Sequence, residues 1–140
     1  MTSRDELSQL LALSSIELFS ESFVFMSVSR VKLGMLLELV RVLEQGMFSF
    51  ILGEEQLSLV VNERTWHKLE FDFDEGRTIT GLRLIAIRSK IQMNSAGLTK
   101  LLADVLGERM GSVVLTFENQ YLLVHENDAE LVFQTLKGLA

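Results

Sequence analysis

The chain has 140 residues and a net charge of −6, and 48% of its residues are hydrophobic. It has no cysteine, which excludes disulfides and thiolate metal sites, and no basic stripe, which argues against nucleic acid as a partner. No apolar run reaches the roughly 18 residues of a membrane helix, and the N-terminus lacks the pattern of a signal peptide. We therefore expect a cytoplasmic protein without a membrane partner, folded as one compact body or as two small halves that share a core.

The first predicted element is a short helix from Ser3 to about Leu13. Ser3 and Glu6 have the spacing of a capping box, and Leu7, Leu10 and Leu11 form an apolar stripe. A short extended piece, Ile16–Phe19, precedes a strand at Ser22–Arg30. Both faces of that strand are largely apolar, which is typical of a central strand.

A helix, a hairpin and a second helix follow. The first helix runs from Gly34 to about Gln45, and the hairpin strands are Met47–Leu52 and Gln56–Val61. Asn62 caps a short helix that ends near Leu69. The segment Glu70–Thr80 alternates phenylalanine with aspartate, which is typical of an edge strand or a solvated turn.

The second half of the chain repeats this order. Gly81–Ile91 is a predicted strand, and Ser95 caps an amphipathic helix that Gly111 follows. A hairpin comes next, with strands Val113–Phe117 and Gln120–His125 around Glu118-Asn119. Asn127 and Glu130 predict the capped start of the last helix.

Two offsets in residue number align the halves. In the helices, an offset of 65 matches Leu36, Leu37 and Val40 to Leu101, Leu102 and Val105. In the hairpins, an offset of 64 matches Gln56, Leu59 and Val60 to Gln120, Leu123 and Val124. This predicts two copies of one small domain, although two similar units could also arise by chance.

The expected fold is α+β, with two ferredoxin-like (βαββαβ-type) subdomains at 1–76 and 77–140. Their sheets are antiparallel with helices on one face, and Phe48–Leu52 and Val113–Phe117 are expected to be central strands. The fourth strand is plain in neither copy. Glu70–Phe73 could complete the first sheet and Ile16–Phe19 the second, which would interlock the two halves.

The run AGLTKLLADVLGERMGSVVLTFENQYLLV resembles the ACT domain, in particular the short tandem-ACT proteins related to aspartokinase regulatory domains and CASTOR-type amino-acid sensors. The resemblance rests on Gly97 and Gly111, on Thr116-Phe117, and on the closing strand Leu122-Leu123-Val124. The segment DELSQLLALSSIELFSESFVFMSVS also resembles the leading helix and first strand of small bacterial proteins of this kind.

The resemblance implies a regulatory or sensor module and not an enzyme, without cofactor or metal. ACT domains typically bind amino acids at an interface between paired domains, with the ligand carboxylate at the strand-to-helix loop. A helix N-terminus suits a carboxylate because its N–H groups are unpaired, and a glycine lets the ligand approach the backbone. The ligand is then expected against three residues of that connection and near three of the hairpin: Asn94, Ser95 and Gly97, with Thr116, Asn119 and Gln120.

The chain departs from the family pattern at two positions of the second copy, and the first copy has Lys32-Leu33 in place of the polar Asn-Ser lead. Gln120 stands where relatives have aspartate, and a neutral amide cannot supply the charge that pairs with an amine. Leu115 stands where relatives often have serine. We therefore expect weak amino-acid binding, or a ligand without an amine. The alternative function is a protein–protein interaction module without a small ligand, and the high apolar content predicts a homodimer.

Overall fold

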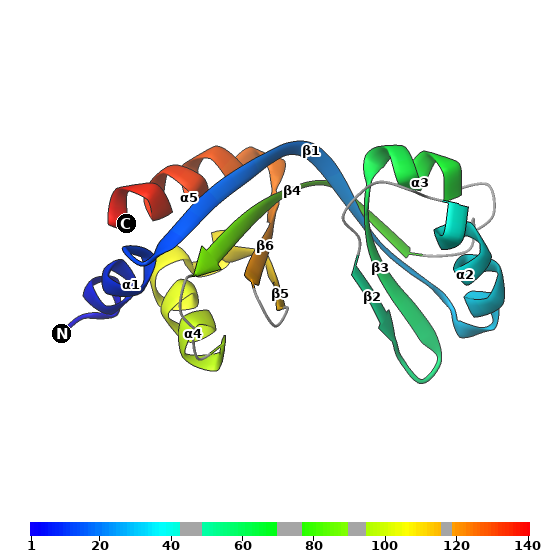
Figure 1. Ribbon diagram of the computed structural model, residues 1–140, viewed down its shortest axis with the longest axis horizontal. Coiled ribbons are helices and arrows are strands. Elements are labelled where there is room, and N and C mark those ends of the chain that lie inside the picture. The colour runs from blue at the N-terminus through cyan, green and yellow to red at the C-terminus, as the bar shows by residue number, and fades with distance from the viewer. Residues whose placement is uncertain (43–48, 70–76, 90–94, 116–118) are drawn as a thin grey trace. The chain divides into compact units, whose positions relative to one another are not determined.

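The computed structural model describes residues 1–42, 49–69, 77–89, 95–115 and 119–140 (Figure 1). In chain order the elements within these ranges are α1 Ser3–Leu11, β1 Ser14–Ser29, the 3-10 helix η1 Arg30–Lys32, α2 Leu33–Val42, β2 Ser49–Leu52, β3 Gln56–Asn62, α3 Glu63–Leu69, β4 Arg77–Ser89, α4 Ser95–Leu106, the 3-10 helix η2 Gly107–Met110, β5 Ser112–Leu115, β6 Asn119–His125 and α5 Glu126–Leu139. The predicted α+β class is confirmed, and the hairpins follow the helices in the predicted order.

Spatial contacts divide the chain into two compact units. One consists of Met1–Ser20 together with Arg83–Ala140, and the other of Glu21–Leu82. We call them the outer and the inner unit, after their positions in the sequence. The strand order is β2-β3-β1-β4-β6-β5, and β1 and β4 each contribute residues to both units. The predicted boundary between residues 76 and 77 stays a prediction, whereas the contacts place α1 in the outer unit.

In the inner unit, β3 pairs antiparallel with both β1 and β2, with Val60 opposite Phe25 and Ser58 opposite Ile51. Alternate residues of β1 and β3 point to one face, because the side-chain period of a strand is two. They form a core with a residue of α2: Met26, Val28, Leu36, Leu57, Leu59 and Val61. Leu33 and Trp66 pack against this core, so α2 and α3 cover the same face of the sheet.

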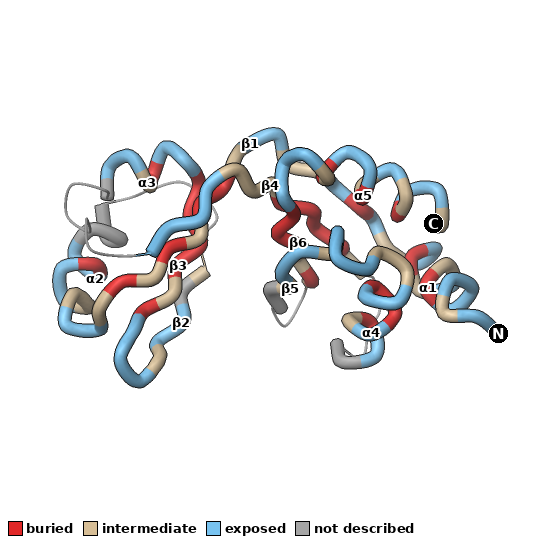
Figure 2. The backbone as a smooth tube through the Cα atoms, turned by 180° about the vertical axis from the view of Figure 1, so that it is seen from behind, coloured by how far each residue is buried: buried red, intermediate tan, exposed pale blue. Residues whose placement is uncertain are grey.

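In the outer unit, β5 pairs antiparallel with β6, with Val113 opposite Leu122. The core joins three helices and three strands, and it consists of Leu7, Leu11, Ile16, Ile85, Ile87, Leu98, Leu101, Leu102, Leu122, Val124, Val132 and Leu136. Figure 2 shows the buried residues of this unit gathered along β4 and β6 and along the helices. One face of β4 and β6 therefore packs against α1, α4 and α5.

Two predicted pieces, Ile16–Phe19 and Ser22–Arg30, are parts of the single strand β1. Ile16–Phe19 lies in the outer unit, next to β4 in the strand order, as the suggested completion of the second copy requires. The other suggested strand, Glu70–Phe73, lies outside the described residues. The first part of β4, Arg77–Leu82, belongs to the inner unit instead.

The prediction that the first strand of each hairpin is central in its sheet is wrong. In the order of the described strands β2 and β5 stand at the two ends, and each has one neighbour among them. The reason is that β3 and β6 use their second edges to pair with β1 and β4. Phe48, Thr116 and Phe117, which also belonged to these predicted strands, lie outside the described residues.

The N-terminal capping box lies one residue earlier than predicted. The Thr2 hydroxyl accepts a hydrogen bond from the Asp5 backbone N–H at 3.1 Å, and an Asp5 carboxylate oxygen accepts one from the Thr2 N–H at 3.3 Å. Ser3 is therefore the first helical residue and not the cap. Its hydroxyl instead donates to Asp104 of α4 at 2.9 Å.

The caps of α3 and α5 differ. The Asn62 side chain accepts from the Thr65 N–H at 2.8 Å, which confirms the predicted cap of α3. At α5 the cap is His125, whose Nδ1 accepts from the Asn127 N–H at 3.2 Å. Asn127 itself is already helical, so the predicted cap at Asn127 is wrong by two residues. Asn62 and His125 thus hold the same place, at the end of a hairpin and the start of a helix.

Candidate functional site

The predicted ligand site falls on the outer unit, at the starts of α4 and β6. Ser95 is the first residue of α4, and Gly97 is exposed in the first turn of that helix. Asn119 and Gln120 are the first two residues of β6. Asn94 and Thr116 lie outside the described residues. The structure therefore places four of the six predicted residues.

Gln120 faces the helices. It lies on the same face of β6 as Leu122 and Val124, because residues two apart in a strand share a face. These two residues belong to the outer core together with Leu98 of α4. Its side chain is buried, with only 6% of the residue exposed. Gln120 thus lies on the side of the sheet from which α4 starts, as the predicted site requires.

The amide oxygen of Gln120 has no hydrogen-bond partner within the described part of the chain. Most buried polar groups in proteins are hydrogen-bonded, because an unpaired one loses its interactions with water and gains nothing in return. It is the one buried side-chain acceptor of this kind among the described residues. An unpaired buried acceptor of this sort needs a physical explanation.

Asn119 points to the opposite side of β6. Its Nδ2 donates a hydrogen bond to the hydroxyl of Tyr121 at 3.2 Å. Asn119 and Tyr121 both lie on the face of β6 opposite to Gln120. The structure therefore brings Gln120 to the α4 side of the sheet and leaves Asn119 on the other side. This separation follows from their being neighbours in one strand.

The burial of β3 and β6 shows that the offset of 64 residues, used to align the hairpins, is off by one. Counted back from the capping residue, Leu57 is fifth before Asn62, and Gln120 is fifth before His125. Both face the helices of their units, and Leu57 is 0% exposed. A shift of one residue exchanges the faces of a strand, so the equivalent of Gln120 is Leu57 and not Gln56. Gln120 is therefore a polar residue at a core position.

Gln56, the predicted counterpart, has a different environment. It is exposed at the start of β3, and its amide oxygen accepts a hydrogen bond from the Ser27 hydroxyl at 3.2 Å. The two glutamines thus share a residue type and a place near a turn, but only Gln120 is buried without a partner for its oxygen.

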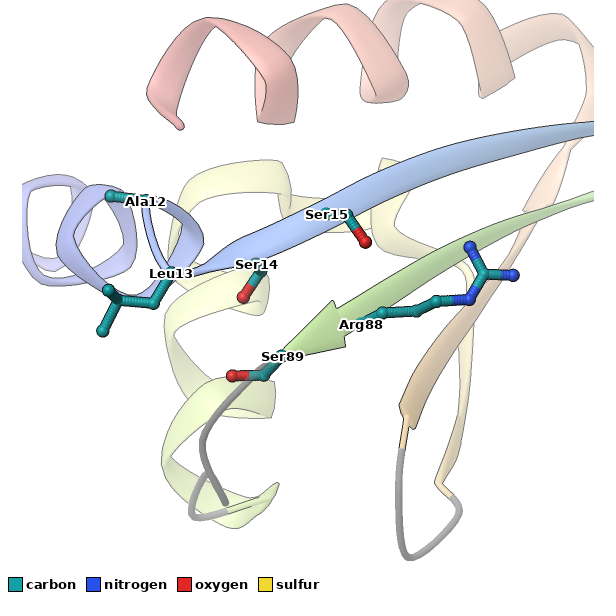
Figure 3. A pocket seen from close by; sticks show the side chains of 6 residues that line it. All are labelled: Ala12, Leu13, Ser14, Ser15, Arg88 and Ser89. Atoms are coloured by element: carbon teal, nitrogen blue, oxygen red, sulfur yellow. The ribbon is translucent and has the colours of Figure 1, made fainter.

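A pocket of about 370 Å³ lies at the end of β4, the strand that precedes α4. It is lined by residues of the turn after α1, the start of β1 and the end of β4: Ala12, Leu13, Ser14, Ser15, Arg88 and Ser89. Figure 3 shows the serines of β1 and Ser89 around the strand ends, with the Arg88 side chain extended along the strands. A pocket of this volume lies in the range of small-molecule sites.

The charge in this pocket is partly neutralised. Both terminal nitrogens of Arg88 donate to one carboxylate oxygen of Glu17, at 3.3 and 3.2 Å, and the guanidinium lies 5.7 Å from the Phe19 ring centroid. Further N–H groups of the guanidinium remain for a ligand, since arginine has five. The pocket can therefore hold a small polar molecule and offers it a positive group beside hydroxyls.

None of the six pocket residues was predicted from the sequence. Ser14 and Ser15 follow the predicted end of the first helix near Leu13, and in the structure the Ser14 hydroxyl donates to the Leu10 carbonyl at 3.1 Å. Arg88 and Ser89 lay within the predicted strand Gly81–Ile91 and were not singled out. The available signal was strand alternation, which puts Ser15 and Glu17 on one face of β1. Which strand lies beside β1 could not be read from local pattern.

The described residues hold no cluster of three or more His, Cys, Asp or Glu side chains that could bind a metal ion. Their helices also include none that is long and apolar enough to cross a membrane.

No protein-family model and no curated protein sequence matches the chain. Solved structures do match. A Vibrio cholerae protein of unknown function, a possible transport protein, has a TM-score of 0.70 and 21% identity, with 99% of each chain covered. The ligand-free regulatory subunit of aspartate kinase from Thermus thermophilus has a TM-score of 0.62 and 6% identity, with 89% of this chain and 95% of that chain covered.

Escherichia coli aspartokinase III, in complex with lysine and aspartate, has a TM-score of 0.59 and 17% identity. The match covers 89% of this chain and 32% of that enzyme. At these identities the likeness concerns the fold. The predicted resemblance to the regulatory ACT domains of aspartokinases is confirmed at that level.

Proposed function

We propose that the chain is a non-enzymatic regulatory or sensor module that binds an amino acid. In this proposal the ligand lies at an interface between paired ACT-like subdomains of a homodimer. The observation that carries the proposal is the buried, unpartnered amide oxygen of Gln120, on the same side of the outer sheet as the start of α4. The predicted cytoplasmic location stays a prediction.

Two features support a small ligand at this end of the outer unit. The first turn of α4 contains Ser95 and the exposed Gly97, and the backbone N–H groups of a first turn favour a carboxylate. The pocket beside Arg88 and Ser89 lies at the end of β4, before that helix. The fold likeness to aspartokinase regulatory subunits supports a regulatory role.

Thermal unfolding in the presence of single amino acids tests this proposal. A ligand that binds only the folded state raises the free energy of unfolding by about 2.7 kcal/mol at a hundredfold excess over Kd. Arginine, lysine, threonine and aspartate are the first probes, and at least one is expected to raise Tm. If none does at millimolar concentration, amino-acid binding is wrong.

The location of the site is tested by Gly97→Val, with Gly97→Ala as its matched control. Valine adds a branched side chain where the ligand is expected to approach, whereas alanine adds one methyl group and favours the helix. The valine variant is expected to lose the ligand-induced rise in Tm and the alanine variant to keep most of it. Equal affinity in Gly97→Val and the parent protein would place the site elsewhere.

The second candidate function is an interaction module without a small ligand. The inner unit favours it, because large apolar side chains are exposed on η1 and α2: Val31, Met35 and Leu37, with Val31 87% exposed. Exposed apolar groups of this kind often mark protein contacts. This candidate predicts that no amino acid changes Tm, while Val31→Lys weakens self-association.

A further inference from the structure

Arg88 lines the pocket at the end of β4 and pairs with Glu17 on the face of the outer sheet that points away from the core. Their neighbours in the strands, Ile16 and Ile87, belong to that core. Since successive side chains of a strand point to opposite faces, Glu17 and Arg88 point away from the helices that cover the core. The ligand site predicted at the start of α4 lies on the other face, where Gln120 shares its side of β6 with core residues. Arg88 is therefore part of a separate surface.

The ion pair with Glu17 uses the guanidinium of Arg88 incompletely. Both terminal nitrogens donate to a single oxygen of Glu17, at 3.3 and 3.2 Å. An arginine often binds a carboxylate through two parallel hydrogen bonds to its two oxygens, at about 2.7–2.9 Å. The side chains of Arg88 and Glu17 are also 39% and 50% exposed, and ion pairs at such positions add little to stability. An anion that meets the guanidinium with two oxygens can therefore compete with Glu17.

The rest of the pocket fits a small carboxylate with a short apolar part. Its wall combines serine hydroxyls with apolar side chains: Ser14, Ser15, Ser89, Ala12 and Leu13. Ser15 is exposed and shares its face of β1 with Glu17, so its hydroxyl lies on the side of the strands that carries Arg88 (Figure 3). A planar carboxylate matches the fork of a guanidinium and also accepts from a hydroxyl. Leu13, which is 50% exposed, gives the apolar part of the ligand a contact.

We propose that this pocket binds a small monocarboxylate through the guanidinium of Arg88, and that Glu17 holds the guanidinium when no anion is bound. The site does not depend on the proposed amino-acid site, since the ligand needs no amine. Glu17 acts as an internal competitor, which keeps the affinity for the anion low. It also repels a second negative charge on the ligand, so a monoanion is favoured over a dianion.

Titration with propionate at pH 7 and constant ionic strength, followed by NMR, tests the site. The signals to follow are the side-chain Nε–H of Arg88 and the backbone N–H groups of Ser15 and Ser89. All three are expected to shift along one saturating curve. Succinate, which carries a second carboxylate, is expected to bind about 5-fold more weakly than propionate, the effect of one like charge a few ångströms away in water.

Arg88→Gln and Glu17→Gln are expected to act in opposite directions. Arg88→Gln should weaken propionate binding at least about 10-fold, because it removes hydrogen bonds from a charged donor. Glu17→Gln should tighten it by up to about 5-fold, because it removes the competing carboxylate of an exposed pair. Arg88→Lys keeps the charge but loses the fork, so it should also weaken binding and repeats the test if Arg88→Gln does not fold.

Arg109→Gln is the matched control. Arg109 is also an exposed arginine beside an acid, at 3.9 Å from Asp128, but it lies outside this pocket. The variant is expected to bind propionate as the parent does. An equal loss in Arg109→Gln and Arg88→Gln would show attraction to any exposed arginine and would overturn the proposal.

The proposal is also wrong if propionate gives no saturable shift, if Arg88→Gln binds as tightly as the parent, if Glu17→Gln binds more weakly, or if succinate binds as tightly as propionate. Propionate carries no amine, so each of these results leaves the amino-acid proposal to its own test by thermal unfolding.

Discussion

Gly111 passes so close to Leu123 that a Cβ atom on Gly111 would lie 2.0 Å from the Leu123 carbonyl oxygen. Gly111 has a φ of 69° and a ψ of −136°, a conformation that only glycine adopts without strain. It stands between η2 and β5, and the next residue, Ser112, pairs with Leu123. This close approach sets where the hairpin of the outer unit begins.

Gly111→Ala is therefore expected to lower the free energy of unfolding by at least about 3 kcal/mol, because it adds backbone strain and a collision with main-chain atoms. Gly107→Ala is the control. Gly107 also has a positive φ, of 61°, but a Cβ atom there meets nothing within 4 Å. Gly107→Ala should lower the free energy of unfolding by only about 1–2 kcal/mol. Equal losses in chemical denaturation would contradict the assigned close approach.

Exchanging the residues at the two equivalent core positions should have opposite effects. Leu57→Gln buries an amide in an apolar core and is expected to lower the free energy of unfolding by about 2–5 kcal/mol, since it combines lost packing with an unpaired polar group. Gln120→Leu is expected to raise it by about 1–3 kcal/mol. Urea denaturation checks both. A loss of stability in Gln120→Leu would show that the glutamine has a partner after all.

The two helix caps predict a second pair of opposite effects. Asn62→Ala removes the acceptor for the Thr65 N–H and a donor to Glu21 at 3.2 Å. It should lower the free energy of unfolding by about 1–2 kcal/mol. His125→Asp puts a stronger cap, with negative charge, at the start of α5. It should raise the free energy of unfolding by about 0.5–1 kcal/mol. Thermal unfolding at neutral pH measures both changes. A destabilising His125→Asp would argue against His125 as the cap.

Acid is expected to remove the contribution of Asp5. Hydrogen bonds from the Thr2 hydroxyl at 2.8 Å and the Thr2 N–H at 3.3 Å lower the pKa of Asp5 below its ordinary value of about 3.9. A carboxyl whose pKa is lower in the folded state adds stability above its unfolded pKa, and this stability is lost as the pH falls through the folded pKa.

Asp5→Asn should thus melt below the parent protein at pH 7, and the difference should disappear as the pH falls below about 3.9. Glu6→Gln is the control, because Glu6 lies in the same turn but accepts no bond from Thr2 in the capping box. Its effect on Tm at pH 7 should be smaller than that of Asp5→Asn. A difference for Asp5→Asn that does not vary with pH would contradict this account.

The protein is expected to form a homodimer through exposed apolar side chains. The high apolar content and the two end strands predict a homodimer, so light scattering should give about twice the 15.8 kDa of one chain. Ile51 is 61% exposed on the end strand β2, and Ile51→Lys is expected to shift the protein toward monomer. Leu131→Lys, at an exposed position on α5, should leave the dimer unchanged. A mass near that of one chain for the parent protein would refute the prediction.

Local pattern predicted most of the elements. The helix at Ser95 and the hairpins followed from side-chain periodicity and turn residues, which act over a few neighbours. Strand order was not accessible in the same way. The end positions of β2 and β5 depend on β1 and β4, which are distant in sequence, and only their pairing decides which strands are central.

The candidate site was predicted in part. A glycine near a helix start and a glutamine after a turn were visible in the sequence, but the burial of Gln120 was not. Its alignment with Gln56 matched residue types, and a one-residue error in a strand exchanges inside and outside. Only the count back from the caps at Asn62 and His125 shows that Gln120 corresponds to a core leucine.

The passage of β1 and β4 through both units also sets an order for folding during synthesis. Domains generally fold as they leave the ribosome, beginning with the N-terminal one. Here the continuous segment Glu21–Leu82 is complete first, whereas α1 emerges before it and belongs to a unit that needs Arg83–Ala140. The apolar side chains Leu7 and Leu11 find their partners on α4 and α5 only after the last third of the chain has been made. The apolar side of α1 thus has no partner until α4 and α5 have been made.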